Sequence, residues 1–134
     1  MAHTILVVDD DPKVVRVVEI NLAQEGYQIR TAADGEEALA AVARERPDLV
    51  LLDVMMPRMD GFEALKRLKA DPATAEIPII MLTARAQDED VFEGYGTGAQ
   101  WYLTKPFDPT ELRRVVRHLL TQDRGAEGGA PPGA

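Results

Sequence analysis

The first apolar run of the chain ends in three acidic residues. Asp9, Asp10 and Asp11 directly follow the run Ile5–Val8. A short apolar run of this kind predicts a buried strand, so its end brings at least two carboxylates to one small rim, where like charges repel. We therefore expect a cation at this rim.

Three later apolar runs also end in residues that could do chemistry. The run Leu49–Leu52 is followed by Asp53, and the next two such runs end in Thr83 and Lys105. Acids, a hydroxyl and an amine that each close a strand indicate a divalent-metal site that handles a phosphoryl group.

The elements that must position these residues alternate along the chain. Five short, mostly apolar segments are typical of strands covered on both faces. These predicted strands are Ile5–Val8, Ile29–Ala32, Leu49–Leu52, Ile79–Leu82 and Tyr102–Thr104. Segments with helical spacing lie between them, and the clearest apolar face is in the last helix, which is predicted to end near Thr121. Its members are Leu112, Val115, Val116, Leu119 and Leu120. The first predicted helix has a broader stripe, which comprises Val14, Val15, Val17, Val18 and Leu22.

Aspartates mark the predicted helix starts. Asp34, Asp60 and Asp108 each precede a Glu by three residues, the spacing of a capping box. Asp11 precedes Pro12, so we expect Asp11 to cap a helix and not to bind a metal. Gly26 is expected to end the first helix in a left-handed conformation.

Five strands that alternate with five helices predict an α/β domain with a doubly wound parallel sheet. In such a sheet the functional crevice lies outside the carboxyl ends of the strands, where the strand order reverses. With the order 2-1-3-4-5, the crevice falls between strands 1 and 3. Asp9, Asp10 and Asp53 would then meet there, with Thr83 beside them and Lys105 closing the row.

Composition is consistent with one domain over residues 3–121, followed by a flexible Gly/Pro/Ala-rich tail or linker at 122–134. The 134 residues carry 15 Lys and Arg against 23 Asp and Glu, a net charge of −8. This balance argues against direct nucleic-acid binding and against an anionic membrane surface as a partner. The chain has no cysteine and no membrane-length apolar run, so we expect a cytoplasmic protein without thiolate chemistry.

Four motifs together resemble the receiver domain of two-component response regulators. They are Ile5-Leu6-Val7-Val8-Asp9-Asp10-Asp11, Leu51-Leu52-Asp53-Val54-Met55-Met56-Pro57-Arg58-Met59-Asp60-Gly61, Leu82-Thr83-Ala84 and Thr104-Lys105-Pro106-Phe107. The resemblance implies a flavodoxin-like fold, and the 2-1-3-4-5 strand order used above is partly taken from this resemblance.

The resemblance also implies roles for individual residues. Asp53 would be the phosphoacceptor, and Mg²⁺ (or Mn²⁺) would be bound by Asp10, Asp53 and the Met55 backbone carbonyl, with Asp9 acting through water. Further predicted contacts of the phosphoryl group are Lys105, Thr83 and the Ala84 amide. A cis Lys105-Pro106 peptide bond is expected as well.

The implied switch couples Thr83 to Tyr102, which would rotate inward and change the surface of helix 4, strand 5 and helix 5. The implied partners are a sensor histidine kinase or phosphotransfer protein and a downstream protein target, with the chain itself a monomer or weak homodimer. The protein would catalyse its own phosphoryl transfer without being a turnover enzyme. Met55 and Arg85 would screen the acyl phosphate from water and slow its loss.

Three alternatives belong to other classes. A flavodoxin-type cofactor binder shares the topology but needs a Ser/Thr/Gly-rich phosphate loop, where this chain has three carboxylates. A phosphatase of the haloacid dehalogenase type needs a second Asp two residues after the first, where this chain has Met55. A degenerate receiver that acts as a constitutive interaction module is the remaining alternative.

Overall fold

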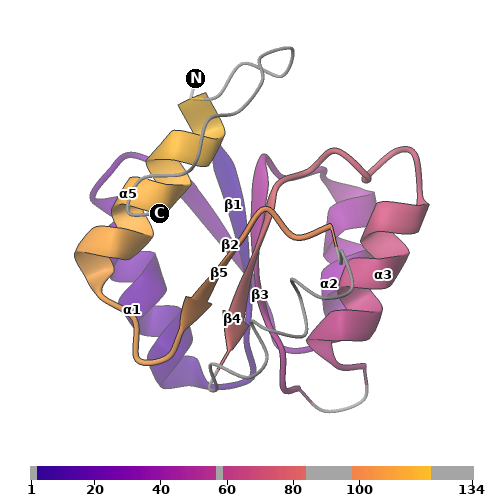
Figure 1. Ribbon diagram of the computed structural model, residues 1–134, viewed down its shortest axis with the longest axis horizontal. Helices are drawn as coiled ribbons and strands as arrows, with labels where there is room; N and C mark the ends of the chain where they lie inside the picture. The colour runs from indigo at the N-terminus through magenta and orange to yellow at the C-terminus, as the bar shows by residue number, and fades with distance from the viewer. Residues whose placement is uncertain (1–2, 57–58, 84–97, 122–134) are drawn as a thin grey trace.

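The computed structural model describes residues 3–56, 59–83 and 98–121. Within them, five strands and four helices alternate along the chain (Figure 1). The strands are β1 (Thr4–Val8), β2 (Gln28–Ala32), β3 (Leu49–Asp53), β4 (Ile79–Thr83) and β5 (Trp101–Thr104). The helices are α1 (Pro12–Ala23), α2 (Gly35–Arg44), α3 (Gly61–Ala70) and α5 (Pro109–Thr121). The helix expected between β4 and β5 lies outside the described residues.

All strand pairs are parallel, and the sheet order is β2-β1-β3-β4-β5, as predicted. Each predicted strand is present, and each begins or ends within one residue of the expected bound. Helices α1 and α5 cover one face of the sheet, and α2 and α3 cover the other (Figure 1). This is the doubly wound, flavodoxin-like arrangement.

Side chains alternate between two cores, one on each face of the sheet. Along β3, Leu49 and Leu51 face α1 and α5, whereas Val50 and Leu52 face α2 and α3. The three central strands are buried along their whole length, which explains their continuous apolar sequences.

Two expectations about burial were wrong. Strand β2 is mostly exposed and not covered on both faces, because it lies at the edge of the sheet, where its sequence alternates with polar residues. In α1 only Val18 and Leu22 are fully buried, and Val17 is 44% exposed. The helix therefore packs through a narrower stripe than its run of valines suggests, whereas α5 buries the face that was predicted.

The aspartate caps are present at every predicted helix start. The carboxylate of Asp11 accepts the Lys13 N–H at 2.9 Å, so Asp11 caps α1. The other caps accept in the same way, Asp34 from Glu37 N–H, Asp60 from Glu63 N–H and Asp108 from Thr110 N–H. Gly26 follows α1 with φ of 91°, the left-handed conformation that was predicted.

Candidate phosphoacceptor and metal site

Every strand except β2 contributes its carboxyl end to one crowded edge of the domain. Asp9 and Asp10 follow β1, Asp53 closes β3, Thr83 closes β4 and Lys105 follows β5. The register places the ends of adjacent strands side by side, with Asp53 opposite Leu82 and Thr83 opposite Thr104. The parallel order thus gathers residues that are up to 96 positions apart.

The three carboxylates predicted to bind a metal do meet. Asp9, Asp10 and Asp53 each offer an oxygen, and these oxygens lie within 4.8 Å of one another. Asp9 and Asp53 are 3% and 4% exposed, whereas Asp10 faces solvent. A compact set of carboxylates open to water on one side suits a hard cation such as Mg²⁺, which keeps several waters of its own.

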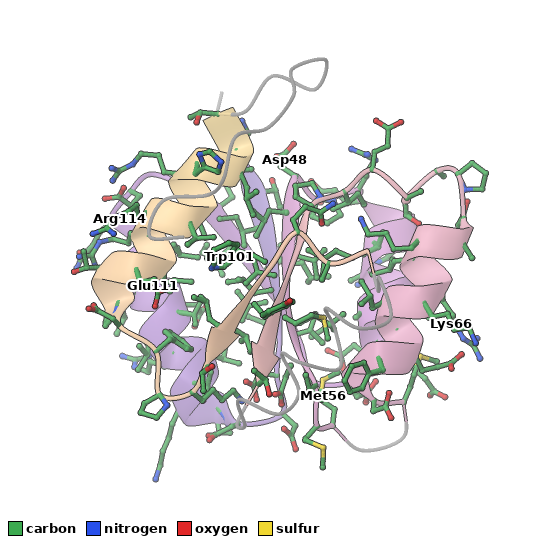
Figure 2. The ribbon with its side chains drawn as sticks, in the orientation of Figure 1. Asp48, Met56, Lys66, Trp101, Glu111 and Arg114 are labelled. Atoms are coloured by element: carbon green, nitrogen blue, oxygen red, sulfur yellow. The ribbon has the colours of Figure 1, made fainter. Side chains whose placement is uncertain are left out.

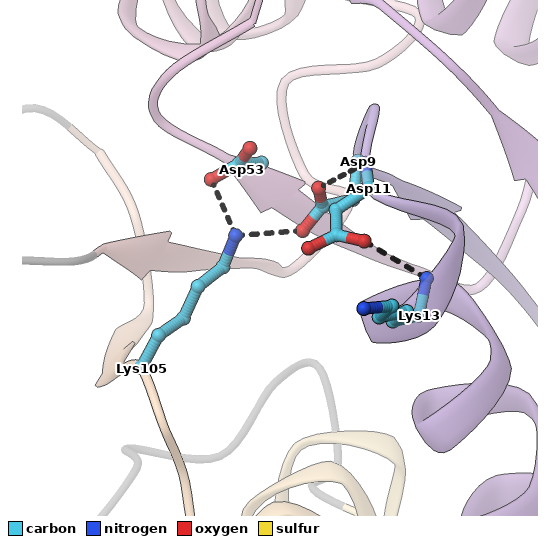
Figure 3. Close-up of polar contacts among 5 residues, drawn as sticks. All are labelled: Asp9, Asp11, Lys13, Asp53 and Lys105. Carbon is cyan, nitrogen blue, oxygen red and sulfur yellow. Dashed lines mark hydrogen bonds and ion pairs between the residues drawn. The ribbon is translucent and has the colours of Figure 1, made fainter.

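Lys105, which follows β5, extends its side chain toward Asp9 and Asp53 (Figure 3). Its Nζ donates to Asp9 Oδ2 at 2.8 Å and to Asp53 Oδ1 at 3.1 Å. Its backbone N–H donates to the carbonyl of Thr83, which ties the β5 end to the β4 end. The Lys105-Pro106 peptide bond is cis, as predicted.

The charges of the cluster set the protonation of its members. Burial, followed by the nearby charge of Asp9, raises the pKa of Asp53 to about 6, although Lys105 and the Met55 backbone N–H both oppose this shift by hydrogen bonding to its carboxylate. Burial lowers the pKa of Lys105, but its bonds to Asp9 and Asp53 outweigh burial and raise that pKa overall. One ammonium is shared by two buried acids, so the cluster can accept a further cation.

Asp9 is already held in place by the protein. Its Oδ1 accepts the Asp11 N–H at 2.9 Å, while its Oδ2 accepts Lys105. Asp11 turns away to cap α1, where Figure 3 shows it bonded to the backbone nitrogen of Lys13. The acidic triplet therefore divides into one buried anchor, one solvent-facing carboxylate and one helix cap.

Thr83 and Tyr102, the predicted switch pair, lie on the same face of the sheet. Thr83 is fully buried, and Tyr102 is half-buried against the core beside α2 and α3. Tyr102 is paired with Met81 and Thr104 with Thr83, so the tyrosine is a diagonal neighbour of Thr83. Ala84 and Arg85, predicted to contact the phosphoryl group and to screen it, lie outside the described residues.

Sequence reasoning assigned no packing role to Gly61. Gly61 begins α3, is buried, and donates its N–H to the Val54 carbonyl at 2.9 Å, just beyond Asp53. The available signal was the repeated Asp-Gly pair at the starts of α2 and α3. Met55, in contrast, extends outward and is 61% exposed beside the site.

Fold and site together define a doubly wound α/β protein with clustered carboxylates and a lysine at the carboxyl ends of its strands, and comparison with known proteins identifies the family. Residues 5–117 match the response regulator receiver domain family. The chain belongs to this family, the receivers of two-component response regulators, which act in signal transduction.

Relatives of known sequence include proteins much longer than this chain. The chain is 47% identical over 116 residues to the DNA-binding dual master transcriptional regulator RpaA of Synechocystis sp., covering 87% of this chain and 48% of that protein. It is 44% identical over 131 residues to the alkaline phosphatase synthesis transcriptional regulatory protein PhoP of Bacillus subtilis, covering 98% and 52%. It is also 48% identical over 119 residues to the response regulator PleD of Caulobacter vibrioides, covering 89% and 26%. The chain thus spans about half the length of the first two and about a quarter of the third.

Solved structures show the same fold at similar identity. The chemotaxis response regulator CheY4 of Vibrio cholerae superposes with a TM-score of 0.82 at 38% identity, over 90% of this chain and 100% of that one. The receiver domain of the Francisella response regulator 1452 gives a TM-score of 0.80 at 35% identity, over 88% and 96%. In the described part of this chain, no helix is long and apolar enough to cross a membrane.

Proposed function

We propose that Asp53 is the phosphoacceptor of this receiver and takes a phosphoryl group from a sensor histidine kinase or phosphotransfer protein in a reaction that depends on Mg²⁺ or Mn²⁺. The observation that carries the proposal is the contact of one lysine, Lys105, with both buried acids, Asp9 and Asp53, beside the exposed carboxylate of Asp10. A nucleophile, an anion-binding ammonium and a candidate cation site thus share one edge of the sheet.

The chemistry follows from the charge on Asp53. With a pKa of about 6, its carboxyl is mostly ionised at neutral pH. A carboxylate oxygen attacks the phosphorus of a phosphohistidine, the P–O bond forms as the P–N bond breaks, and the imidazole leaves with the electron pair. A cation held by Asp10, Asp53 and the Met55 carbonyl would supply positive charge to neutralise the phosphoryl oxygens. Lys105 then loses part of its contact with Asp53 and pairs with a phosphoryl oxygen.

The remaining site residues complete these contacts. Asp10, Asp53 and the Met55 carbonyl are the proposed direct ligands of the cation. Asp9, which is already held by hydrogen bonds from the Asp11 N–H and Lys105, acts through water. Thr83 and the Ala84 amide take the other phosphoryl oxygens.

The proposed output is a change of packing around Thr83. Phosphorylation adds nearly two negative charges and three acceptor oxygens at Asp53, which draws the Thr83 hydroxyl toward the site. Tyr102 then moves further into the space that Thr83 leaves, and the surface formed by β5, α5 and the segment before β5 shifts between two states. A protein partner or an attached output region binds that surface in the cytoplasm. The receiver domain itself binds no nucleic acid and is a monomer or weak homodimer.

Acetyl phosphate tests the phosphoacceptor. With Mg²⁺ it should add one phosphoryl mass to the wild-type protein, and hydroxylamine should remove it, as it does from acyl phosphates. Asp53→Asn should gain no mass, whereas the control Asp71→Asn should be labelled like the wild type. Asp71 is exposed just after the last residue of α3, and its side chain accepts the Ala73 N–H, a bond that asparagine can also make. A folded wild type that never gains the mass would point instead to a constitutive interaction module.

A further inference from the structure

Two glycines begin helices directly after capping aspartates, and both helices rest on the same connection. Gly35 is the first residue of α2 after Asp34, and Gly61 is the first residue of α3 after Asp60. Both glycines are buried. Each packs on the connection between β3 and α3, whose described residues are 54–56 and 59–60.

Space, and not backbone conformation, requires glycine at position 61. The positive φ angles among the described glycines belong to Gly26 and Gly98, so Gly61 does not use the left-handed region. A Cβ at Gly61 would overlap the carbonyl oxygen of Asp53 and would lie 2.9 Å from both the Asp53 carbonyl carbon and Val54 Cα. These are backbone atoms, which cannot rotate away as a side chain can, so α3 or the end of β3 would have to move.

Gly35 holds the other end of the connection from α2. A Cβ there would lie 2.7 Å from the Met59 carbonyl oxygen and 2.9 Å from Met59 Cβ and Cγ. The overlap is smaller than at Gly61, and part of it involves a flexible side chain. The connection is thus held at its start by the first turn of α3 and near its end by the first turn of α2.

The backbone held in this way includes Met55. Its N–H bonds to the carboxylate of Asp53, and this bond lowers the pKa of that acid. The nucleophile and the proposed carbonyl ligand of the cation are thus separated by one residue, Val54, and the Gly61 N–H closes the same turn on the Val54 carbonyl. A shift of the turn would move the Met55 carbonyl relative to Asp53.

We infer that Gly61, supported by Gly35, is a positioning residue for the cation site. Because Gly61 has no side chain, α3 packs closely against the end of β3, and this packing holds the Met55 backbone where its carbonyl can serve as a ligand. This inference rests on the proposed function, in which the Met55 carbonyl is a cation ligand. Groups that support metal ligands from behind typically change metal affinity by about 10- to 100-fold when altered.

Three glycine-to-alanine variants test the inference. Gly61→Ala should weaken Mn²⁺ binding, measured by electron paramagnetic resonance, by about tenfold or more. It should also speed hydrogen exchange at the Met55 amide in the metal-free protein. Gly35→Ala should produce smaller changes of the same kind. Helix propensity alone predicts the opposite, a more stable protein with unchanged binding, because alanine favours helices over glycine.

Gly26→Ala is the matched control. Gly26 lies between α1 and β2, at the amino end of β2 and therefore away from the site at the carboxyl ends of the strands. An added Cβ there would have no atom within 4 Å. The Gly26 φ of 91° strains any alanine, so this variant should lose stability and still bind Mn²⁺ like the wild type. Weaker Mn²⁺ binding by Gly26→Ala would show that general loss of stability, and not the position of Met55, accounts for the effect.

A folded Gly61→Ala that keeps wild-type Mn²⁺ affinity and wild-type exchange at Met55 would overturn the inference. If Gly61→Ala does not fold, the same two readings on Gly35→Ala decide it in the same way. Asp10→Asn separates this result from a failure of the proposed site. If the wild type and Asp10→Asn both fail to bind Mn²⁺, the proposed metal site itself is wrong. In that case, an unchanged rate of hydrogen exchange at the Met55 amide in the glycine variants would also exclude the positioning role of Gly61.

Discussion

Replacing Asp53 with asparagine should stabilise the metal-free protein at neutral pH, although it removes the proposed nucleophile. Asp53 is buried next to the charge of Asp9, and its pKa of about 6 shows that the fold resists its ionisation. Asparagine resembles the neutral acid, and its side-chain oxygen can still accept the Lys105 hydrogen bond. The variant thus avoids the cost of ionising a buried acid.

The size of this effect depends on pH in a defined direction. A carboxyl whose pKa is raised on folding binds more protons in the folded than in the unfolded chain between the two pKa values, so the free energy of unfolding falls as pH rises through that window. For Asp53 the window runs from about 4, the ordinary value for an aspartate, to about 6. At 1.36 kcal/mol per pKa unit, the ionised acid costs about 3 kcal/mol at pH 7 and about 1 kcal/mol at pH 4.5.

Urea unfolding of the two proteins in EDTA measures this cost. Trp101, the single tryptophan, and circular dichroism should report coincident transitions. The stability gain of Asp53→Asn should grow by about 2 kcal/mol from pH 4.5 to pH 7. Comparison at each pH cancels the titration of groups that do not interact with Asp53, and Asp71→Asn should show no comparable growth. A gain that is equal at the two pH values, or a loss at pH 7, would refute the assigned burial cost.

Mg²⁺ should cancel most of the stability difference between the wild type and Asp53→Asn at pH 7, because at a hundred times its dissociation constant it adds about 2.7 kcal/mol to a protein that binds it only when folded. Thermal melts should show this gain in the wild type and in Asp71→Asn but little of it in Asp10→Asn, and an equal gain in Asp10→Asn would exclude the carboxylate cluster as the site. Lys105→Ala should still gain stability from Mg²⁺ but lose most of the Trp101 fluorescence change that acetyl phosphate causes, because the lysine ammonium contacts the phosphoryl group in the wild type. A full fluorescence response in Lys105→Ala would contradict that role. Met55→Asn should shorten the lifetime of the phosphorylated protein, since the exposed methionine is the proposed screen against water, and phosphorylated protein that decays at the wild-type rate would remove Met55 from the control of lifetime.

Features that depend on local physical chemistry could be predicted from the sequence. The Asp caps at Asp11, Asp34, Asp60 and Asp108 form because a carboxylate at that position can reach a free N–H of the next turn, whatever lies elsewhere in the chain. The strands followed from continuous apolar runs, and the parallel sheet followed from their alternation with helices.

Burial at the edges of the fold was less predictable. Strand β2 and Val17 look like buried elements from composition alone, but exposure depends on which neighbour covers them. Sheet order decides this, because a strand with a partner on only one side keeps part of its surface in water.

The sequence by itself determined the chemical inventory of the site: the carboxylates of Asp9, Asp10 and Asp53 and the amine of Lys105, each placed at the end of a strand. Only the tertiary structure decided how these groups share charge, with one ammonium between two buried acids and a pKa of about 6 on Asp53. It also decided that Gly61 must lack a side chain, since that requirement comes from the backbone of β3 across the turn. Burial, electrostatic coupling and close backbone contact all depend on distances between segments far apart in the chain, and such distances exist only after the sheet has formed.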